Sequence, residues 1–293
     1  MDLDIKKYTE NQFGEVKELM KYSYVEPLVI QIVEHLKYEF TFMAYDGANL
    51  VGLIVTWKNK LHPYCLYFRL YIKPFSSQNV GLQLLQYVKQ NEVLEFPLQT
   101  SLWETSRELM ELYEQLDMNI IRKTYMPKLD LQQRFQVLDQ SVYELKTLKD
   151  IMDNHSQMER LTELVKRNYE ETHLANPVAE MSIQQWQQLY SDAILDGSFI
   201  LCNPVNQNII AYSFLHEAED EAELEIGWSG VDQLEHLSVL QILTSHQITY
   251  AKTNDYKYLV GEFDTTSIYA LEILKSCPFE PSPTWITFQG GKC

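Results

Sequence analysis

The sequence predicts an α/β protein built from two domains of the same kind. Three observations lead to this prediction. The chain has 293 residues, more than the roughly 100–200 residues of a common single domain. Hydrophobic residues make up 45% of it and charged residues 22%, a composition that supports an extensive core. Strand-like and helix-like periodicities alternate along the chain, and their order occurs twice.

The first half begins with a strand around residues 3–8, followed by two helices and a hairpin. Apolar residues at helical spacing predict a helix from Phe13 to Met20, and Pro27 is suited to the first turn of the next helix, up to residue 38. The hairpin is a strong signal, because Asp46-Gly47 separates two β-rich runs. The remaining predicted elements are strand 64–75, helix 82–90, strand 98–103, helix 106–116 and a closing strand pair or bent hairpin over 120–131.

The second half repeats this order after a linker. Residues 132–141 are polar and rich in glutamine, which predicts a linker between a first domain, 1–131, and a second domain, 142–293. Ser182 is suited to cap the start of a helix. The predicted elements are strand 142–145, helices 158–169 and 182–195, strands 198–202, 209–215 and 224–231, helix 237–253, strand 258–262, helix 267–275 and strand 283–289.

The charge of the chain is strongly negative, with 24 Lys and Arg against 41 Asp and Glu and a formal net charge of −17. Such a surface repels phosphate backbones and anionic lipids, which argues against nucleic acid or a membrane as the main partner. No Lys or Arg occurs between Arg167 and Lys252. The acidic run from Glu217 to Glu225 is either a solvated turn or a surface that attracts a cationic amine.

The sequence predicts a cytoplasmic location. No apolar run reaches the ~20 residues that span a bilayer, and the first ten residues have no signal-peptide core. The four cysteines are Cys65, Cys202, Cys277 and Cys293. Because they are far apart and have no histidine at zinc spacing, we expect neither a disulfide framework nor a structural metal.

The repeated order β-α-α-β-β-β-α-β-α-β resembles the GNAT superfamily of N-acetyltransferases in tandem. The resemblance is sharpest at residues 70–85 and at residues 225–231, which lead to residues 284–288 at the end of the chain. It implies that each domain is a mixed, mostly antiparallel sheet flanked by helices. It also implies transfer of an acetyl group from acetyl-CoA to a primary amine of a small molecule, by a monomer or homodimer.

The family's pyrophosphate loop has the form Gln/Arg-x-x-Gly-x-Gly/Ala between a strand and a helix. Backbone N–H groups at a helix start bind phosphates, and glycine allows close approach. Gln78 and Gly81 match the pattern, whereas Gln83 stands where a second Gly or Ala is usual. An ordinary strand-to-helix turn is the alternative. The resemblance implies these cofactor-binding residues: Ile72, Lys73, Gln78, Asn79, Val80, Gly81, Leu82 and Gln83.

The same loop in the second half has lost its glycines. Val239 and Gln241 stand at the two glycine positions, and His236 replaces the Gln/Arg. No Lys or Arg follows before Lys252. The second domain is therefore expected to be a degenerate copy that serves structure or substrate binding.

The family's general acid is often a tyrosine on the helix after strand five. Tyr113 matches this position in the first half, and Leu274 stands there in the second. Packing in the core beside Leu109 and Leu116 is the alternative for Tyr113. Glu104, just after the strand, is the candidate general base, with a rim carboxylate as the alternative. A catalytically inactive tandem that binds a ligand or partner is the rival function.

Overall fold

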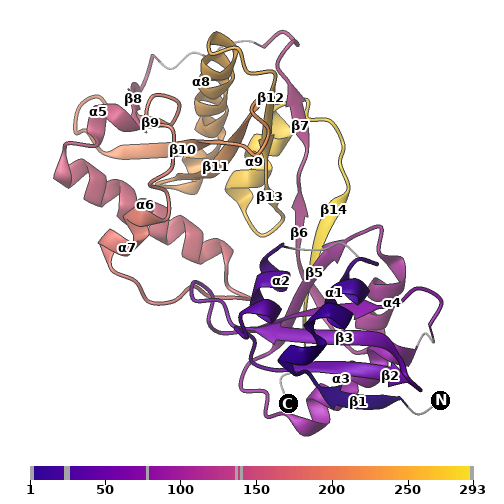
Figure 1. Cartoon of the computed structure of the whole chain (residues 1–293). Coiled ribbons are helices and arrows are strands. Elements are labelled where there is room, and N and C mark those ends of the chain that lie inside the picture. The colour runs from indigo at the N-terminus through magenta and orange to yellow at the C-terminus, as the bar shows by residue number, and fades with distance from the viewer. Residues whose placement is uncertain (1–2, 23–26, 77–78, 136–137, 139–140, 291–293) are drawn as a thin grey trace. The chain divides into compact units, whose positions relative to one another are not determined.

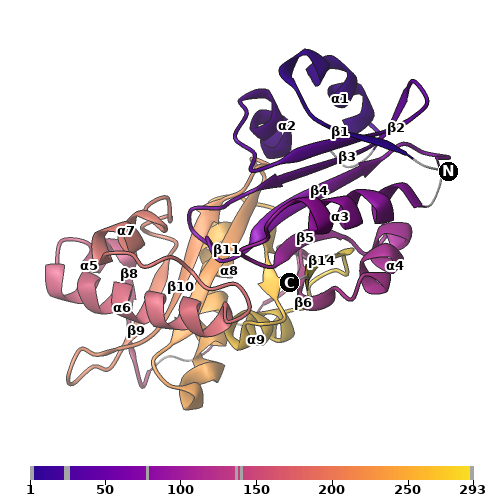
Figure 2. The same cartoon turned by 90° about the horizontal axis from the view of Figure 1, so that it is seen from below.

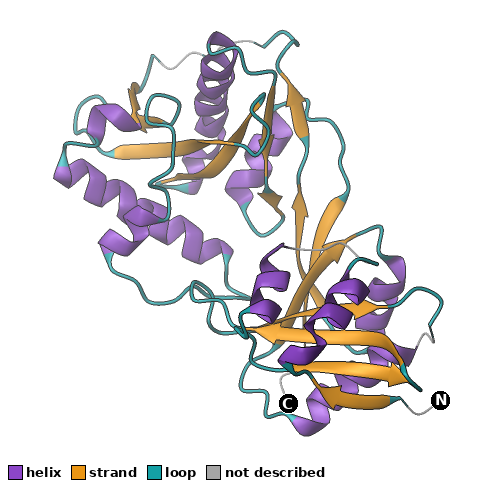
Figure 3. Cartoon of the chain, in the orientation of Figure 1, coloured by secondary structure: helices purple, strands orange, loops and turns teal. Residues whose placement is uncertain are grey.

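The structure, a computed structural model, describes residues 3–22, 27–76, 79–135, 138 and 141–290. The chain forms two compact units (Figure 1). Unit 1 takes its residues from Met1–Ile121, Ala175–Ala179 and Ile286–Cys293, and unit 2 from Arg122–Leu174 and Glu180–Trp285. Each unit has a mixed sheet flanked by helices (Figure 3), so the predicted fold class is confirmed.

The sheet of unit 1 contains the strands β1-β2-β3-β4-β5-β14 in this order and continues with β6 and β13. The neighbours from β1 to β4 are antiparallel, and β4 and β5 are parallel. Helices α1 and α2 cover one face of this sheet, and α3 and α4 the other (Figure 2). The elements are β1 (Asp4–Lys7), η1 (Glu10–Gln12), α1 (Phe13–Met20), α2 (Pro27–Glu34), β2 (Thr41–Asp46), β3 (Asn49–Trp57), β4 (Leu66–Ile72), α3 (Asn79–Asn91), β5 (Leu98–Trp103), α4 (Arg107–Gln115) and β14 (Thr284–Gly290).

The predicted hairpin at Asp46-Gly47 is confirmed by the pairing of β2 with β3. Gly47 has a φ of 61°, which a glycine adopts without steric cost. Strand β3 is buried at every residue after Asn49. Both of its faces are covered, because Leu53 belongs to the core under α1 and α2 and Ile54 to the core under α3 and α4. A continuous apolar run is the pattern of a strand buried on both faces.

The strands of unit 2 follow the order β7-β12-β11-β10-β9-β8. The pair β11–β12 is parallel and the other neighbours are antiparallel. Helix α8 and helix α6 contribute to different cores of the unit. The elements are β6 (Asn119–Tyr125), β7 (Lys128–Asp130), β8 (Glu144–Thr147), α5 (Leu148–Ile151), α6 (His155–Thr172), α7 (Ile183–Gln188), β9 (Phe199–Cys202), β10 (Ile209–Glu217), β11 (Glu223–Val231), η2 (Leu234–Val239), α8 (Leu240–Thr253), β12 (Tyr258–Gly261), β13 (Phe263–Asp264) and α9 (Ile268–Ser276).

Helix ends in unit 2 follow the capping residues of the sequence. Ser182 caps α7 as expected, since its Oγ accepts a hydrogen bond from the Gln185 amide at 3.3 Å. The helix ends at Gln188, earlier than the predicted residue 195. Helix α8 begins at Leu240 and is preceded by the 3-10 helix η2.

The predicted strand pair over residues 120–131 is wrong as a hairpin, because β6 and β7 are not neighbours in any sheet. Strand β7 instead pairs with β12, and Leu129 is buried in the core of unit 2. Strand β14 pairs in the sheet of unit 1 and buries Ile286 and Phe288 in its core. We call this arrangement the strand exchange: β7 contributes to unit 2, and residues 286–290 contribute to unit 1.

The predicted division of the chain placed the first domain at residues 1–131 and the second at 142–293. The compact units differ from it in the two segments of the strand exchange and in Ala175–Ala179, which belongs to unit 1. Within the predicted linker, residues 136–137 and 139–140 lie outside the described residues. Phe135 packs against the core of unit 2. Alternating hydrophobicity identifies a strand, but it does not identify the strand's partner.

Candidate functional site

The sheet of unit 2 opens between β11 and β12. These strands are paired in parallel from Glu223–Tyr258 to Ile226–Gly261. After Gly261 the chain leaves this pairing, and β13 pairs with Thr124 and Tyr125 of β6. The second half of β11, from Gly227 to Val231, continues without a register partner on β12 among the described residues. The diverging strands leave backbone groups of β11 facing a gap.

A bulge distorts β11 at the same level. The register between β10 and β11 shifts between Ser213 and Leu215, so that two residues of β11, Gly227 and Trp228, lie opposite one residue of β10. Gln247 of α8 is fully buried, and its Nε2 donates to the carbonyls of Ser213 and Phe214 at 3.2 and 3.0 Å. Bulges re-aim backbone and side chains near functional sites.

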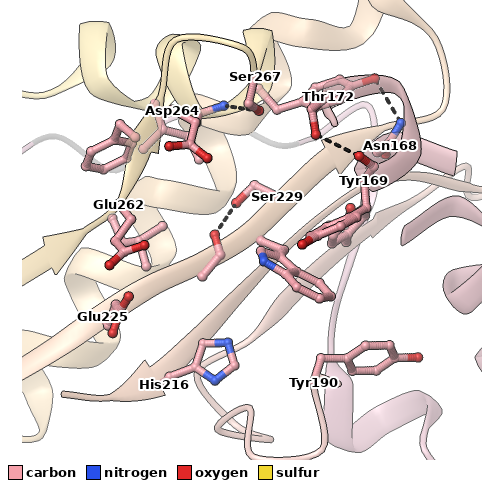
Figure 4. Close-up of a pocket in the computed structure, with 18 of the residues that line it drawn as sticks. Asn168, Tyr169, Thr172, Tyr190, His216, Glu225, Ser229, Glu262, Asp264 and Ser267 are labelled. Carbon is pink, nitrogen blue, oxygen red and sulfur yellow. Dashed lines mark hydrogen bonds between the residues drawn. The ribbon is translucent and has the colours of Figure 1, made fainter. Parts of the chain in front are cut away.

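A cavity of about 440 Å³ lies at this opening, entirely within unit 2 (Figure 4). Its walls come from α6, the segment 189–192, β10, β11, the segment 262–264 and α9. The lining residues used below are Arg122, Asn168, Tyr169, Asp192, His216, Glu217, Glu225, Gly227, Trp228, Ser229, Glu262 and Asp264.

One wall of the cavity is aromatic. The ring of Tyr169 lies 4.6 Å from that of Trp228, centroid to centroid, and 5.5 Å from that of Trp186. It also stacks on His173 at 3.9 Å with an interplanar angle of 8°. Burial raises the pKa of Tyr169 to about 12, so its hydroxyl is protonated at neutral pH. Rings packed this way form a rigid, apolar surface with electron-rich faces.

Carboxylates line another part of the cavity, where Figure 4 shows Glu225, Glu262 and Asp264 on the side away from Tyr169. Burial, and then the charge of Glu262, raise the pKa of Glu225. Desolvation, and then the charge of Asp264, raise the pKa of Glu262, whose side chain is exposed at the rim of the cavity. Arg122 forms an ion pair with Asp264 at 3.3 Å. Glu225 is half-buried, and the negative charge of Glu262 disfavours its ionised form.

His216 lies at the lower end of the cavity in Figure 4, near Glu225. Its Nδ1 is 3.3 Å from Oδ1 of Asp192, and its Nε2 lies directly over Gly227, where any Cβ would overlap it. Burial lowers the pKa of His216 below its usual 6.5. With Nδ1–H donating to Asp192, Nε2 carries a lone pair at neutral pH, which is the state of a general base.

Two arginines lie near the end of β11, where the sequence suggested that cations were lacking. Arg167 of α6 donates from Nη2 to the carbonyl of Asp232 at 2.6 Å and to that of Val231 at 3.3 Å. Arg167 and Arg160 both line a second cavity of about 400 Å³, together with Asp232 and Glu163. The sequence shows only that no Lys or Arg occurs between Arg167 and Lys252. It does not show that α6, which carries both arginines, lies beside the end of β11 in the fold.

The predicted cofactor loop of unit 1 is partly described. Gln78 lies outside the described residues, and α3 begins at Asn79. Lys73 and Gln83 are half-buried, and Val80 is buried. Gly81 is buried as well: a Cβ there would lie 2.5 Å from Leu112 of α4 and 2.8 Å from Leu70. Gly81 thus allows α3 to pack closely, and its role in binding phosphate stays a prediction. Ile72 and Leu82 pack against the same core.

Tyr113 and Glu104, the predicted acid and base, lie in different surroundings. Tyr113 is 2% exposed, and its ring packs edge-on against Phe68 and Phe288 at 5.6 and 5.5 Å. Burial raises the pKa of Tyr113 to about 12. Glu104 is exposed just beyond the end of β5. The structure therefore places Tyr113 in the core of unit 1, which is the alternative that the sequence left open; a catalytic role for either residue stays a prediction.

Substituting Gly230 tests how tightly the wall of the cavity is packed. A Cβ at Gly230 would overlap Oδ1 of Asn168, and Asn168 is held in place because its Nδ2 donates to Val231 O at 3.2 Å and to Tyr269 Oη at 2.9 Å. We expect Gly230→Ala to lower the free energy of unfolding by about 1–3 kcal/mol, measured by urea denaturation. Gly14→Ala is the control, and it should raise the free energy of unfolding. Nothing lies within 4 Å of the new methyl group, and alanine favours the helix. If Gly230→Ala left the free energy of unfolding unchanged, the close packing at this position would be contradicted.

Neither a metal centre nor a membrane span is found in the part of the chain that the structure describes. No group of three or more His, Cys, Asp or Glu side chains there is arranged to hold a metal ion. None of the described helices has the length and apolar character to cross a bilayer.

Comparisons with known proteins give similarity in structure without similarity in sequence. No protein-family model matches the chain, and no curated protein sequence matches it. The chain is similar to a GCN5-related N-acetyltransferase from Sphaerobacter thermophilus, with a TM-score of 0.61, 12% identity and coverage of 98% of this chain and 95% of that one. It is similar to a tandem GNAT protein from the clavulanic acid biosynthesis pathway, with a TM-score of 0.59, 12% identity and coverage of 99% and 98%.

A third similar structure is a GNAT-family acetyltransferase from Colwellia psychrerythraea, with a TM-score of 0.53, 13% identity and coverage of 98% of this chain and 100% of that one. At identities this low, the similarities establish the fold. They extend over both units and agree with the two mixed sheets described above. The chain therefore has the fold of the GNAT N-acetyltransferases, in tandem.

Proposed function

We propose that this protein is an N-acyltransferase that acetylates an amine held in the cavity of unit 2. The observation that carries the proposal is the opening between β11 and β12. There a stretch of β11 that has no register partner on β12, a bulge at Gly227 and a cavity of about 440 Å³ occur together. Backbone N–H groups facing such a gap suit the oxyanion that forms when a thioester carbonyl is attacked.

His216 is the base in this proposal. Transfer forms a bond between the amine nitrogen and the carbonyl carbon of the thioester, and it breaks the carbon–sulfur bond. The amine loses a proton, which His216 Nε2 accepts while Asp192 holds Nδ1–H. The leaving thiolate takes up a proton from solvent. Glu225 is the neighbouring candidate for the same role, since its raised pKa makes it a stronger base than an exposed carboxylate.

Acetyl-CoA, the donor implied by the fold, supplies the activated acetyl group when bound. Arg160 and Arg167 would hold its phosphates, because two guanidinium groups line one cavity near the end of β11. Asp232 and Glu163 line that cavity too and oppose anion binding. The start of α3 in unit 1, with Gly81, is the second candidate location for the donor.

Titration with acetyl-CoA by calorimetry tests the proposal and locates the donor. We expect wild type to bind, and Arg160→Gln to bind at least tenfold more weakly. Arg134→Gln, which removes one exposed positive charge elsewhere in unit 2, is the matched control and should bind as wild type does.

Each other outcome has a definite meaning. If Lys73→Gln weakens binding at least tenfold and Arg160→Gln does not, the donor binds in unit 1 and the proposed location is wrong. If wild type binds no acetyl-CoA, the proposal fails as a whole, and the alternative of a catalytically inactive tandem that binds a ligand or partner is supported.

A further inference from the structure

We infer that the acceptor in unit 2 is an aliphatic diamine or polyamine, whose second ammonium group is held between the carboxylates and the aromatic wall of the cavity. The inference rests on the proposed function insofar as it calls this ligand the acceptor. The cation site itself follows from the charges and rings that line the cavity.

The charge of the cavity favours a cationic ligand. Five of the described lining residues carry carboxylates, namely Asp192, Glu217, Glu225, Glu262 and Asp264, whereas Arg122 is the single Lys or Arg among them. Arg122 is already paired with Asp264. Glu225 and Glu262 thus face each other's charge, and a bound ammonium group would relieve this repulsion. An acceptor with a carboxylate or phosphate would be repelled.

The aromatic wall suits the same ligand. Tyr169 and Trp228 pack against each other at 4.6 Å and line the cavity, and Figure 4 shows Tyr169 on the side away from the carboxylates. An ammonium group within about 6 Å of such a ring face is attracted by it. The methylene chain of an aliphatic amine also makes favourable apolar contacts with the rings. The hydroxyl groups of a sugar would instead lose their hydrogen bonds with water at this wall.

Asn168 fixes part of the cavity wall. Asn168 lines the cavity and is 2% exposed. Both recorded hydrogen bonds of its side chain are donated by Nδ2. Its Oδ1 has no hydrogen-bond partner among the described residues, and such orphaned buried oxygens are uncommon in native proteins. This oxygen is buried and lies against Gly230, so Asn168 shapes the wall of the cavity and presents no acceptor to the ligand.

The size of the cavity limits the ligand to a small or narrow one. About 440 Å³ is within the range of small-molecule sites and at its lower end. One end of the site holds His216, which takes the proton of the reacting amine. The carboxylates of Glu262 and Asp264 come from the segment after β12, on the other strand that forms the opening. A chain with an amine at each end would place one at each of these two positions.

The test compares 1,4-diaminobutane with butylamine, which has the same carbon chain and one charge less. We expect the diamine to bind wild type at least tenfold more tightly than butylamine. Binding is measured without any acyl donor, by the quenching of tryptophan fluorescence or by calorimetry. Glu262→Gln should reduce this preference to threefold or less. Glu221→Gln is the matched control, because it removes an exposed carboxylate outside the cavity. This variant should retain the full preference for the diamine.

The outcomes separate this inference from the proposed function. Equal binding of the two amines to wild type, or a preference that survives Glu262→Gln, would overturn the inference even if acetyl transfer to other amines is observed. Selective binding of the diamine without acetyl transfer from acetyl-CoA would retain the cation site and overturn the proposed function. Selective binding with transfer to one nitrogen of the diamine, identified by mass spectrometry, supports both.

Discussion

Replacing His216 with asparagine should lower kcat for acetyl transfer by about 10²- to 10⁴-fold, the contribution of a positioned general base. Asparagine is smaller than histidine and still polar, so it fits over Gly227 but accepts no proton at neutral pH. Binding of the diamine in the absence of donor should change little, because the positive charge is held by the carboxylates. The measurement is a steady-state assay of thiol release.

The pH profile distinguishes a catalytic role of His216 from a structural one. Burial lowers its pKa below 6.5 despite the opposing charge of Asp192. The neutral form of His216, which can accept a proton, therefore predominates at pH 6.5 and above. We expect the wild-type rate to fall as the pH drops through this lowered pKa, and the His216→Asn variant to lack that limb. His155→Asn, at an exposed position, is the control. A variant with reduced activity and an unchanged pH profile would assign the base to another residue, with Glu225→Gln as the next test.

Phe288→Ala should lower the free energy of unfolding by about 3–5 kcal/mol, the usual cost of removing a buried phenylalanine. Phe288 is fully buried in the core of unit 1, and its ring packs against Tyr113 at 5.5 Å. The loss leaves a cavity beneath α4 that the rigid sheet cannot close. Chemical denaturation gives the magnitude of the effect.

The location of that loss tests the strand exchange directly. Hydrogen exchange in Phe288→Ala should accelerate first in β5 and α4, which belong to unit 1. Phe288→Leu retains most of the buried volume and should cost less than about 1.5 kcal/mol. Acceleration confined to the amides of unit 2 would show that residues 286–290 stabilise the other unit.

Local sequence signals predicted the elements of the fold well. The Asp46-Gly47 turn and the Ser182 cap each depend on residues within a few positions of one another, and both are confirmed. The strand exchange depends on pairing between strands that are far apart in the sequence, β7 with β12 and β14 with β5. Residues 128–130 and 286–290 have equally plain strand patterns, and neither pattern specifies the partner.

The candidate site was harder to predict than the fold. His216, Glu225 and Glu262 are dispersed along the second half of the chain. His216 and Glu225 lie opposite each other in the pairing of β10 with β11, and Glu262 directly follows β12, the other neighbour of β11. Their individual signals, a lone histidine and two carboxylates, are indistinguishable from surface residues. One part of the site did follow from the sequence. The acidic run that ends at Glu225 predicts a surface that attracts a cationic amine, and Glu225 lines the cavity.

The strand exchange has a consequence for synthesis of the protein. Residues 286–290, which complete the sheet of unit 1, follow the whole of unit 2 in the chain. At about 5–20 residues per second, translation from residue 121 to residue 286 takes roughly 8–33 s. Throughout that time the edge of β5 that later pairs with β14 is bare, and bare strand edges recruit other chains. Nascent chains should therefore need a chaperone at this stage, and ribosome pausing before residue 286 should increase aggregation.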